Sequence, residues 1–237
     1  PVDSEHSAIW QCLAFDRGAP FSKLILTASG GALRDVPLGK LSEMTAKDAL
    51  AHPNWDMGAK ITVDCATMLN KGFEVIEAMR LYDAPLEKVE VVMHRESIVH
   101  SMVAFEDGAV LAQMSYPSME VPIQLALTYP ERLRANVAPL DLAKISALHF
   151  SAPDPARYPC FTLALECAKQ GGDMPCALNA AGEVAVQAFL RGQIKYTQIA
   201  EIIEKTLQKT VRREAESYAL LEETDGAARR TARSFLP

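Results

Sequence analysis

Residues 98–114, IVHSMVAFEDGAVLAQM, contain two runs of strand-forming residues separated by a turn sequence. The runs 98–105 and 109–114 are rich in apolar and β-branched residues. Between them, Glu106-Asp107-Gly108 ends in a glycine, which can adopt the positive φ that a tight turn needs. This stretch therefore predicts a β-hairpin. The apolar runs 23–27 and 89–93 predict two more strands, so we expect a small sheet in the first half of the chain.

Helical patterns surround and follow these strands. Apolar residues recur at three- and four-residue spacing over 66–82, which predicts one amphipathic helix with Asp64 as its N-cap. The later part of the chain is helical in pattern, and the following segments are expected to form helices: 163–169, 181–189, 199–207 and a last helix from Asp225.

These patterns together predict an α+β fold. We expect a mixed small sheet with flanking helices in residues 1–128, a Pro-containing linker at 129–154, and a C-terminal helical bundle at 155–237.

Composition and charge limit the function classes. The chain has 237 residues, 49% hydrophobic and 23% charged, which is typical of a globular protein. Its formal charge is −6 and no Lys/Arg run exceeds two residues, so we expect no nucleic-acid partner. No run approaches the roughly 20 apolar residues of a membrane span, so we expect no membrane partner. The five cysteines form no C-x-x-C pair, which favours a reducing cytosol over a disulfide framework or a zinc site.

Asp3 and Glu5 stand two residues apart near the start of the chain. In an extended segment, side chains at this spacing leave the same face, where two carboxylates can share one hard cation. The alternative is that Asp3 or Ser4 caps a helix that runs through residues 9–13.

Asn70, Lys71 and Glu74 share one turn of the predicted 66–82 helix. An amide, an ammonium and a carboxylate on one face can bind a phosphate and contribute a metal ligand, and Glu77 adds a second carboxylate one turn on. The alternative is a solvated helix face that carries a Lys-Glu pair.

Three further features are less specific. Residues 29–31, Ser-Gly-Gly, follow a strand and can present backbone N–H groups to a phosphate, although such turns are common. His52 and Trp55 lie in a loop bounded by Pro and Gly, which predicts either a lid over a site or a core anchor. His100 alternates within a strand and is either structural or catalytic.

Motif after motif in this chain resembles the 1-deoxy-D-xylulose 5-phosphate reductoisomerase family. The resemblance covers essentially the whole chain, in this order: PVDSEH at 1–6, SGG at 29–31, HPNWDMG at 52–58, VDCATMLNKGFEVIEA at 63–78, IVHSMV at 98–103, YPSMEVPI at 116–123, SALHFSAPDPARYP at 146–159 and ALNAAGEVAV at 177–186.

The resemblance implies an activity and its cofactors. It implies a metal site made by Asp3, Glu5 and Glu74, whose oxygen ligands suit Mg²⁺ or Mn²⁺, with Co²⁺ as a further candidate. The cation would polarise the carbonyl of 1-deoxy-D-xylulose 5-phosphate during rearrangement, and NADPH would then reduce the product to 2-C-methyl-D-erythritol 4-phosphate. It also implies a homodimer in the bacterial cytoplasm, with a plastid origin left open.

The resemblance also assigns roles to individual residues, beyond the three metal ligands. It implies substrate binding by Ser4, Ser29, His52, Cys65, Asn70 and Lys71, catalytic roles for His52, Trp55 and His100, a lid that contains His52, Trp55 and Met57, and contacts of Met57 and Met119 with the nicotinamide cofactor.

The chain departs from the family pattern at three places. Cys65 stands where the family usually has Ser, and residues 94–97 read His-Arg-Glu-Ser instead of His-Pro-Gln-Ser. No glycine-rich dinucleotide fingerprint is present, so we expect a fragment that binds substrate phosphate but does not by itself oxidise NADPH. We expect Cys65 at the N-terminal end of the 66–82 helix, where the helix dipole lowers a thiol pKa.

Two other functions remain open from the sequence. One is a metal-dependent sugar-phosphate isomerase or lyase that needs no hydride. The other is a non-catalytic module for substrate binding and dimerisation.

Overall fold

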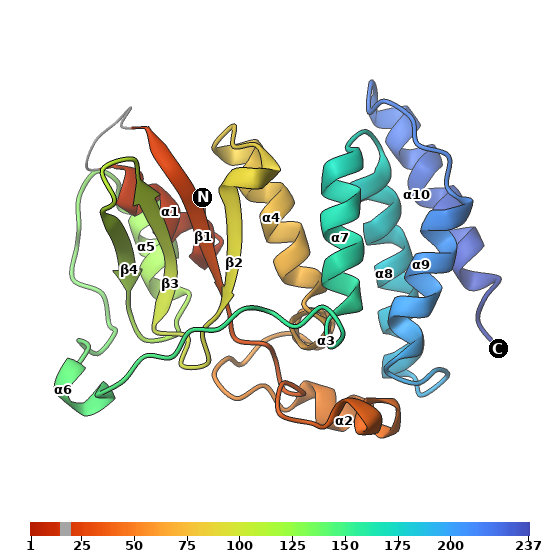
Figure 1. Ribbon diagram of the computed structural model, residues 1–237, viewed down its shortest axis with the longest axis horizontal. Coiled ribbons are helices and arrows are strands. Elements are labelled where there is room, and N and C mark those ends of the chain that lie inside the picture. The colour runs from red at the N-terminus through yellow and green to blue at the C-terminus, as the bar shows by residue number, and fades with distance from the viewer. Residues whose placement is uncertain (15–19) are drawn as a thin grey trace. The chain divides into compact units, whose positions relative to one another are not determined.

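The computed structural model of the chain describes residues 1–14 and 20–237. This part of the chain divides into two compact units, and Figure 1 labels their helices and strands. The first unit consists of residues 1–29 and 77–153, and the second of residues 30–76 and 154–237. Each unit therefore combines segments that are far apart in sequence. The functional division predicted from the sequence, into 1–128, 129–154 and 155–237, stays a prediction.

The first unit contains, in its described residues, a four-stranded mixed sheet (Figure 1). The strand order is β2-β1-β3-β4, with β1 parallel to β2 and the other neighbours antiparallel. The elements of this unit are α1 (Ser4–Leu13), β1 (Phe21–Ala28), η2 (Leu86–Lys88), β2 (Val89–Met93), β3 (Val99–Phe105), β4 (Val110–Met114), α5 (Glu120–Thr128) and α6 (Leu142–Ile145). The predicted mixed small sheet with flanking helices is confirmed.

The β3–β4 hairpin forms where the sequence predicts it. Gly108 has φ 89°, a left-handed conformation that glycine adopts without the steric cost of a Cβ. The Asp107 carboxylate accepts a hydrogen bond from the Ala109 N–H at 2.9 Å, which closes the turn. Strand β1 lies between β2 and β3, and its Leu24 and Leu26 are fully buried.

Helix α1 begins at the N-cap Asp3, whose side chain accepts a hydrogen bond from the Glu5 N–H. Its buried residues Ala8, Ile9 and Cys12 line one side, and the helix packs against β3 and β4. The alternative that Asp3 caps a helix is thus confirmed, and the extended conformation of this segment is wrong. The cap explains the difference, because it satisfies one of the unpaired N–H groups of the first helical turn.

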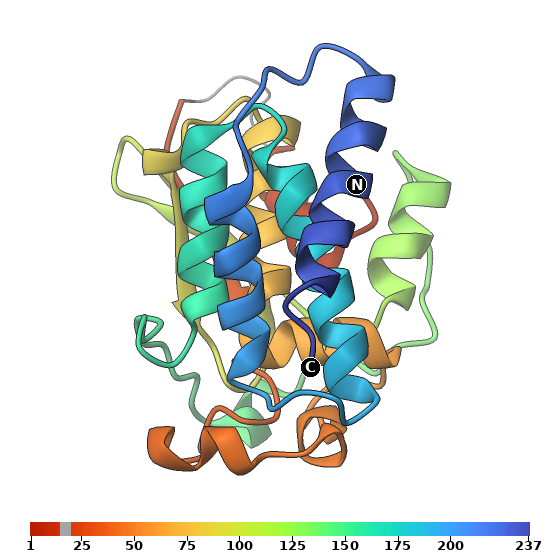
Figure 2. The ribbon, with the colours of Figure 1, turned by 90° about the vertical axis from the view of Figure 1, so that its right-hand side faces the viewer.

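The second unit is mainly helical. Its elements are η1 (Leu38–Glu43), α2 (Ala46–Leu50), α3 (Ala59–Thr67), α7 (Pro159–Gln170), α8 (Met174–Leu190), α9 (Gln198–Lys209) and α10 (Tyr218–Arg233). Helix α4 (Leu69–Leu81) contains the point at which the chain passes between the units. Figure 2 shows α8 among α7, α9 and α10, and α8 packs against all three. Its residues Leu178, Ala181 and Ala185 are fully buried, which makes α8 the centre of the bundle.

The single helix predicted over 66–82 is wrong. Met68 has φ 56°, in the left-handed region, and its reversal separates α3 from α4. Asp64 is consequently a residue of α3 and not an N-cap. The apolar spacing continues through the break because Met68 and Leu69 are both buried. Helix ends of this kind usually carry Gly or Asn at the left-handed position. Because Met stands there in this chain, the sequence does not mark the end of α3.

The last helix begins earlier than predicted, at Tyr218 and not at Asp225. Ser217 caps it by accepting a hydrogen bond from the Leu220 N–H at 3.2 Å. The first turn is exposed, and Tyr218 retains 76% of its accessible surface, so no apolar pattern marks this start. Among the described residues, none of the helices combines the length and apolarity required to cross a bilayer.

Candidate functional site

The N-terminus of α1 carries two carboxylates close together. The Asp3 and Glu5 carboxylate oxygens come within 4.8 Å of each other. The Asp3 carboxylate accepts the Glu5 N–H at 3.1 Å, and the Ser4 hydroxyl donates to the Glu5 carboxylate. The positive end of the helix dipole favours both carboxylates, Asp3 at the N-cap and Glu5 in the first turn. Their spacing is close to that of a pair of oxygen ligands on one hard cation.

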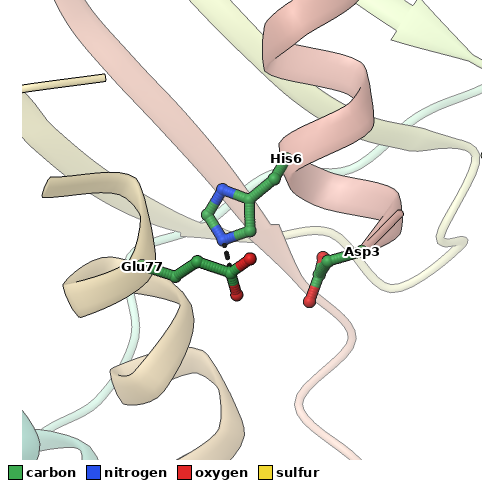
Figure 3. A group of neighbouring side chains, drawn as sticks. All are labelled: Asp3, His6 and Glu77. Atoms are coloured by element: carbon green, nitrogen blue, oxygen red, sulfur yellow. Dashed lines mark ion pairs between the residues drawn. The ribbon is translucent and has the colours of Figure 1, made fainter. Parts of the chain in front are cut away.

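His6 lies one turn along α1 and is fully buried. Its Nε2 lies 3.3 Å from an oxygen of Glu77, and Figure 3 shows Asp3 beside this pair. The Tyr82 hydroxyl donates to the His6 carbonyl oxygen. Burial raises the pKa of Tyr82 above its ordinary range, and the charges of Glu77 and Asp3 raise it further. His6 is part of the motif at residues 1–6, but nothing in the sequence predicts that its side chain lies beside Glu77.

Lys71, Glu74 and Asn70 form a connected group on α4. The Lys71 ammonium and the Asn70 amide each donate to a different oxygen of the Glu74 carboxylate, at 2.5 and 2.6 Å. Lys71 and Glu74 retain only 6% and 3% of their accessible surface. The alternative of a solvated Lys-Glu face is therefore wrong. A buried ion pair of this kind is more costly to assemble than a surface pair, and such pairs are concentrated at functional sites.

The Ser-Gly-Gly turn follows β1 as predicted. Gly30 and Gly31 have φ 80° and 67°, which the side-chain-free residue tolerates. A Cβ on Gly31 would lie 2.4 Å from the Ala66 Cα, so only glycine lets this turn approach α3 so closely. The Tyr158 hydroxyl donates to the Gly30 carbonyl oxygen at 3.2 Å and anchors the turn.

Cys65 lies in the last turn of α3, not at the N-terminal end of a helix. The predicted position at the N-terminal end of a helix is therefore wrong, and the last turn of α3 instead presents carbonyl groups and the negative end of the helix dipole. On the same helix, Asp64 is buried and ion-paired with Lys60 at 2.6 Å. Burial raises the pKa of Asp64, and the Lys60 charge opposes that rise.

The predicted lid, residues 52–58, is held by His52. Its Nδ1 accepts hydrogen bonds from the backbone N–H groups of Asn54 at 3.2 Å and Trp55 at 3.0 Å. Burial lowers the pKa of His52, and the Arg34 charge lowers it further. The ordered loop thus favours the neutral imidazole, which alone can accept at Nδ1. Trp55 and Met57 are each partly buried in this loop, and Trp55 is not among the buried core residues, as a core anchor would be.

We expect the ordered form of this loop to lose stability as pH falls. The folded pKa of His52 lies below its ordinary value of about 6.5, so the opened loop binds a proton more readily than the ordered one. The contribution is fully present above that value and is lost as the pH falls below it. Hydrogen-exchange protection of the Trp55 amide, corrected for intrinsic exchange, should therefore fall between about pH 8 and about pH 5.

The control for this expectation is His52→Gln, which removes the titrating group. Its Trp55 protection should show no corresponding change across the same range. A wild-type protection that is constant, or that rises on acidification, would contradict the assigned role of His52.

His100 lies on β3 and is buried. Its Nε2 is 2.9 Å from the Ser115 hydroxyl, and it lines a cavity of about 10 Å³, the size of one water, together with Ser4 and Gln113. Met119 is the N-cap residue of α5 and retains 39% of its accessible surface. The catalytic role of His100 and the cofactor contact of Met119 stay predictions.

Comparisons with known proteins give one consistent family. A family model described as the 1-deoxy-D-xylulose 5-phosphate reductoisomerase C-terminal domain matches residues 1–82. A second, described as the DXP reductoisomerase C-terminal domain, matches residues 114–231. Relatives named 1-deoxy-D-xylulose 5-phosphate reductoisomerase include those of a Geobacillus species (strain WCH70) and of Trichlorobacter lovleyi. Both are 53% identical to this chain, over 100% and 99% of its length.

Solved structures agree. The reductoisomerase from Zymomonas mobilis in complex with NADPH is 42% identical, with a TM-score of 0.91 over 99% of this chain. A DOX-P reductoisomerase in complex with NADPH, fosmidomycin and magnesium is 40% identical, with a TM-score of 0.90 over 99% of this chain. This chain spans 62% and 60% of the length of the two relatives, and 60% and 62% of the two structures.

Proposed function

The chain belongs to the 1-deoxy-D-xylulose 5-phosphate reductoisomerase family, and we propose on this premise that its protein rearranges and reduces 1-deoxy-D-xylulose 5-phosphate to 2-C-methyl-D-erythritol 4-phosphate. NADPH is the proposed reductant, and related solved structures are described as complexes with NADPH and with magnesium. In the proposal this chain supplies the cation ligands and the phosphate-binding residues. The dinucleotide fingerprint of such an enzyme is not in these residues.

Asp3, Glu5 and Glu74 are the proposed ligands of the cation. The proximity of the Asp3 and Glu5 carboxylates supports this, as does the burial of the Glu74 carboxylate. A donor set made only of carboxylate oxygens fits Mg²⁺, with Mn²⁺ and Co²⁺ as alternatives. When bound, the cation supplies Lewis acidity to the ketone and hydroxyl oxygens of the substrate. The three side chains fix its position and thereby the orientation of those oxygens.

Lys71 is the proposed counter-charge for the substrate phosphate. The chain is net acidic, so attraction of a phosphate has to be local. Lys71 supplies an ammonium that is shielded from water, and Asn70 adjoins it as an amide donor. Ser29 and Cys65 are proposed to complete the phosphate site, and Ser4 to contact the substrate hydroxyls.

His52, Trp55 and Met57 are proposed to close over the substrate and exclude water from the reacting carbons. Met57 and Met119 would then supply an apolar surface for the nicotinamide ring, which the exposed position of Met119 supports. His100 is proposed to act with Ser115 near the substrate hydroxyls, since an imidazole nitrogen can accept a proton from a hydroxyl as a general base. A homodimer in the bacterial cytoplasm completes the proposal.

The observation that carries this proposal is the buried contact of Lys71 with Glu74. One helical turn holds an anion-binding and a cation-binding group, and each neutralises the other when no ligand is present. A metal bound by Glu74 would compete for the carboxylate and make the Lys71 ammonium more available to a phosphate. Cation and phosphate sites should therefore be coupled.

We expect Mg²⁺ to strengthen phosphate binding by the chain at least about 5-fold, the lower end of ordinary coupling between two sites. Calorimetric titration with inorganic phosphate, with and without saturating Mg²⁺, measures this. In Lys71→Met the strengthening should be lost. Equal phosphate affinity with and without Mg²⁺ in the wild-type chain would contradict the coupling.

The activity itself is tested on the full-length protein by NADPH oxidation in the presence of 1-deoxy-D-xylulose 5-phosphate and Mg²⁺, with identification of the product. Oxidation that requires both substrate and cation supports the proposal. A rearranged product that forms without NADPH would favour the hydride-independent isomerase instead. Binding of substrate without conversion would favour the non-catalytic module.

A further inference from the structure

His6 is a buried histidine without hydrogen bonds to its ring. Its side chain is fully buried, and neither Nδ1 nor Nε2 has a hydrogen-bond partner among the described residues. The 3.3 Å approach of Nε2 to the Glu77 oxygen has ion-pair distance but not hydrogen-bond geometry. Polar atoms buried in this way are unusual in folded proteins and point to a functional role.

Two carboxylates face this imidazole. One ligand atom from each of Asp3, His6 and Glu77 lies within 4.8 Å of the other two, and Figure 3 shows the imidazole Nε2 directed at Glu77 with Asp3 alongside. All three residues belong to the first unit. The Glu77 side chain retains 43% of its accessible surface, so the group is open to ions from solvent on that side.

The spacing is close to that of a metal shell. Nitrogen and oxygen ligands lie about 2.0–2.2 Å from Zn²⁺, so two ligands of one ion are at most about 4.4 Å apart. The observed spacing needs only a small closure. Because the Glu77 side chain retains 43% of its accessible surface, its rotation can supply that closure with little repacking.

We propose that Asp3, His6 and Glu77 form a second cation site, which takes a borderline transition metal such as Zn²⁺. One imidazole and two carboxylates favour such an ion over Mg²⁺, whose preferred ligands are all oxygen. The site rests on the proposed function only through Asp3, which the proposed magnesium site also uses. Since Asp3 cannot serve both ions equally, Zn²⁺ bound here should weaken Mg²⁺ binding.

The imidazole itself reports on this site. In ¹⁵N-histidine-labelled chain, the His6 resonance is the one that disappears in His6→Gln. Zn²⁺ should shift the Nε2 signal of His6, and Mg²⁺ at the same concentration should not. Glu77→Gln alters a half-exposed side chain and leaves His6 in place. It should weaken the apparent Zn²⁺ affinity at least about 10-fold.

Two matched variants separate this site from other binding. Glu87→Gln makes the same charge change at an exposed position, and should titrate as wild type. Glu5→Gln removes a proposed magnesium ligand but none of the three here, so it should weaken Mg²⁺ binding while the Zn²⁺ response of His6 persists. An unresponsive His6 resonance, or an unchanged Zn²⁺ titration in Glu77→Gln, would overturn the second site and leave the proposed function standing.

Discussion

Glu74→Gln is expected to lower the free energy of unfolding by about 3–5 kcal/mol, the usual cost of removing one member of a buried ion pair. The substitution deletes the negative charge that the Lys71 ammonium contacts. Both side chains extend from α4 and are nearly inaccessible to solvent. It keeps the shape of the side chain, so loss of packing contributes little. Urea unfolding of the wild-type and variant chains measures the difference.

Two controls isolate the effect of burial. Glu90→Gln breaks the exposed pair with Lys23, whose side chains retain 43% and 52% of their accessible surface, and should cost no more than about 1 kcal/mol. The double change Lys71→Met with Glu74→Leu replaces both charges by apolar groups and should recover most of the lost stability. A loss below about 1 kcal/mol in Glu74→Gln would show that other groups compensate the Lys71 charge.

Gly31→Ala is expected to destabilise the chain by about 2 kcal/mol or more. At φ 67° a residue with a Cβ incurs about 1–2 kcal/mol of steric strain. The new methyl group would also lie 2.4 Å from the Ala66 Cα and 2.6 Å from the Ala66 nitrogen. Overpacking of this kind adds about 1–3 kcal/mol, because the backbone of α3 cannot rotate away as a side chain does.

The matched control is Gly39→Ala, where an added Cβ meets nothing within 4 Å. That variant should unfold within about 0.5 kcal/mol of wild type, as surface substitutions do. Comparable stability of Gly31→Ala and Gly39→Ala would contradict the close approach of the turn to α3.

The sheet could be predicted from the sequence because its signals are local. Residues 98–114 carry two strand patterns and the glycine that turns between them, and the structure places β3 and β4 there. The runs 23–27 and 89–93 also became strands. Their parallel pairing could not be predicted, because it depends on the intervening chain and not on either run.

The break between α3 and α4 was not predictable from periodicity. Met68 adopts a left-handed conformation that the sequence does not announce, and tertiary packing of Met68 and Leu69 holds it there. Because the chain turns at Met68, Asp64 and Cys65 lie near the end of α3 and not at the predicted start of a helix.

The candidate site was only partly accessible to sequence reasoning. The order of the motifs assigned roles to Asp3, Glu5, Lys71 and Glu74, which spacing alone left ambiguous. Burial decided between a solvated face and a buried pair for Lys71 and Glu74, and burial is a property of the whole fold. His6 stayed unassigned because its neighbour Glu77 lies 71 positions away in the chain (77 − 6 = 71).

Anomalous diffraction from crystals grown with Mn²⁺ tests the central claim most directly, since it locates the ion without assuming its ligands. We predict a manganese peak within about 2.0–2.3 Å of carboxylate oxygens from Asp3, Glu5 and Glu74. The peak should be absent in crystals of Glu74→Gln. Manganese bound without Glu74, or bound unchanged in that variant, would contradict the metal site on which the proposed function depends.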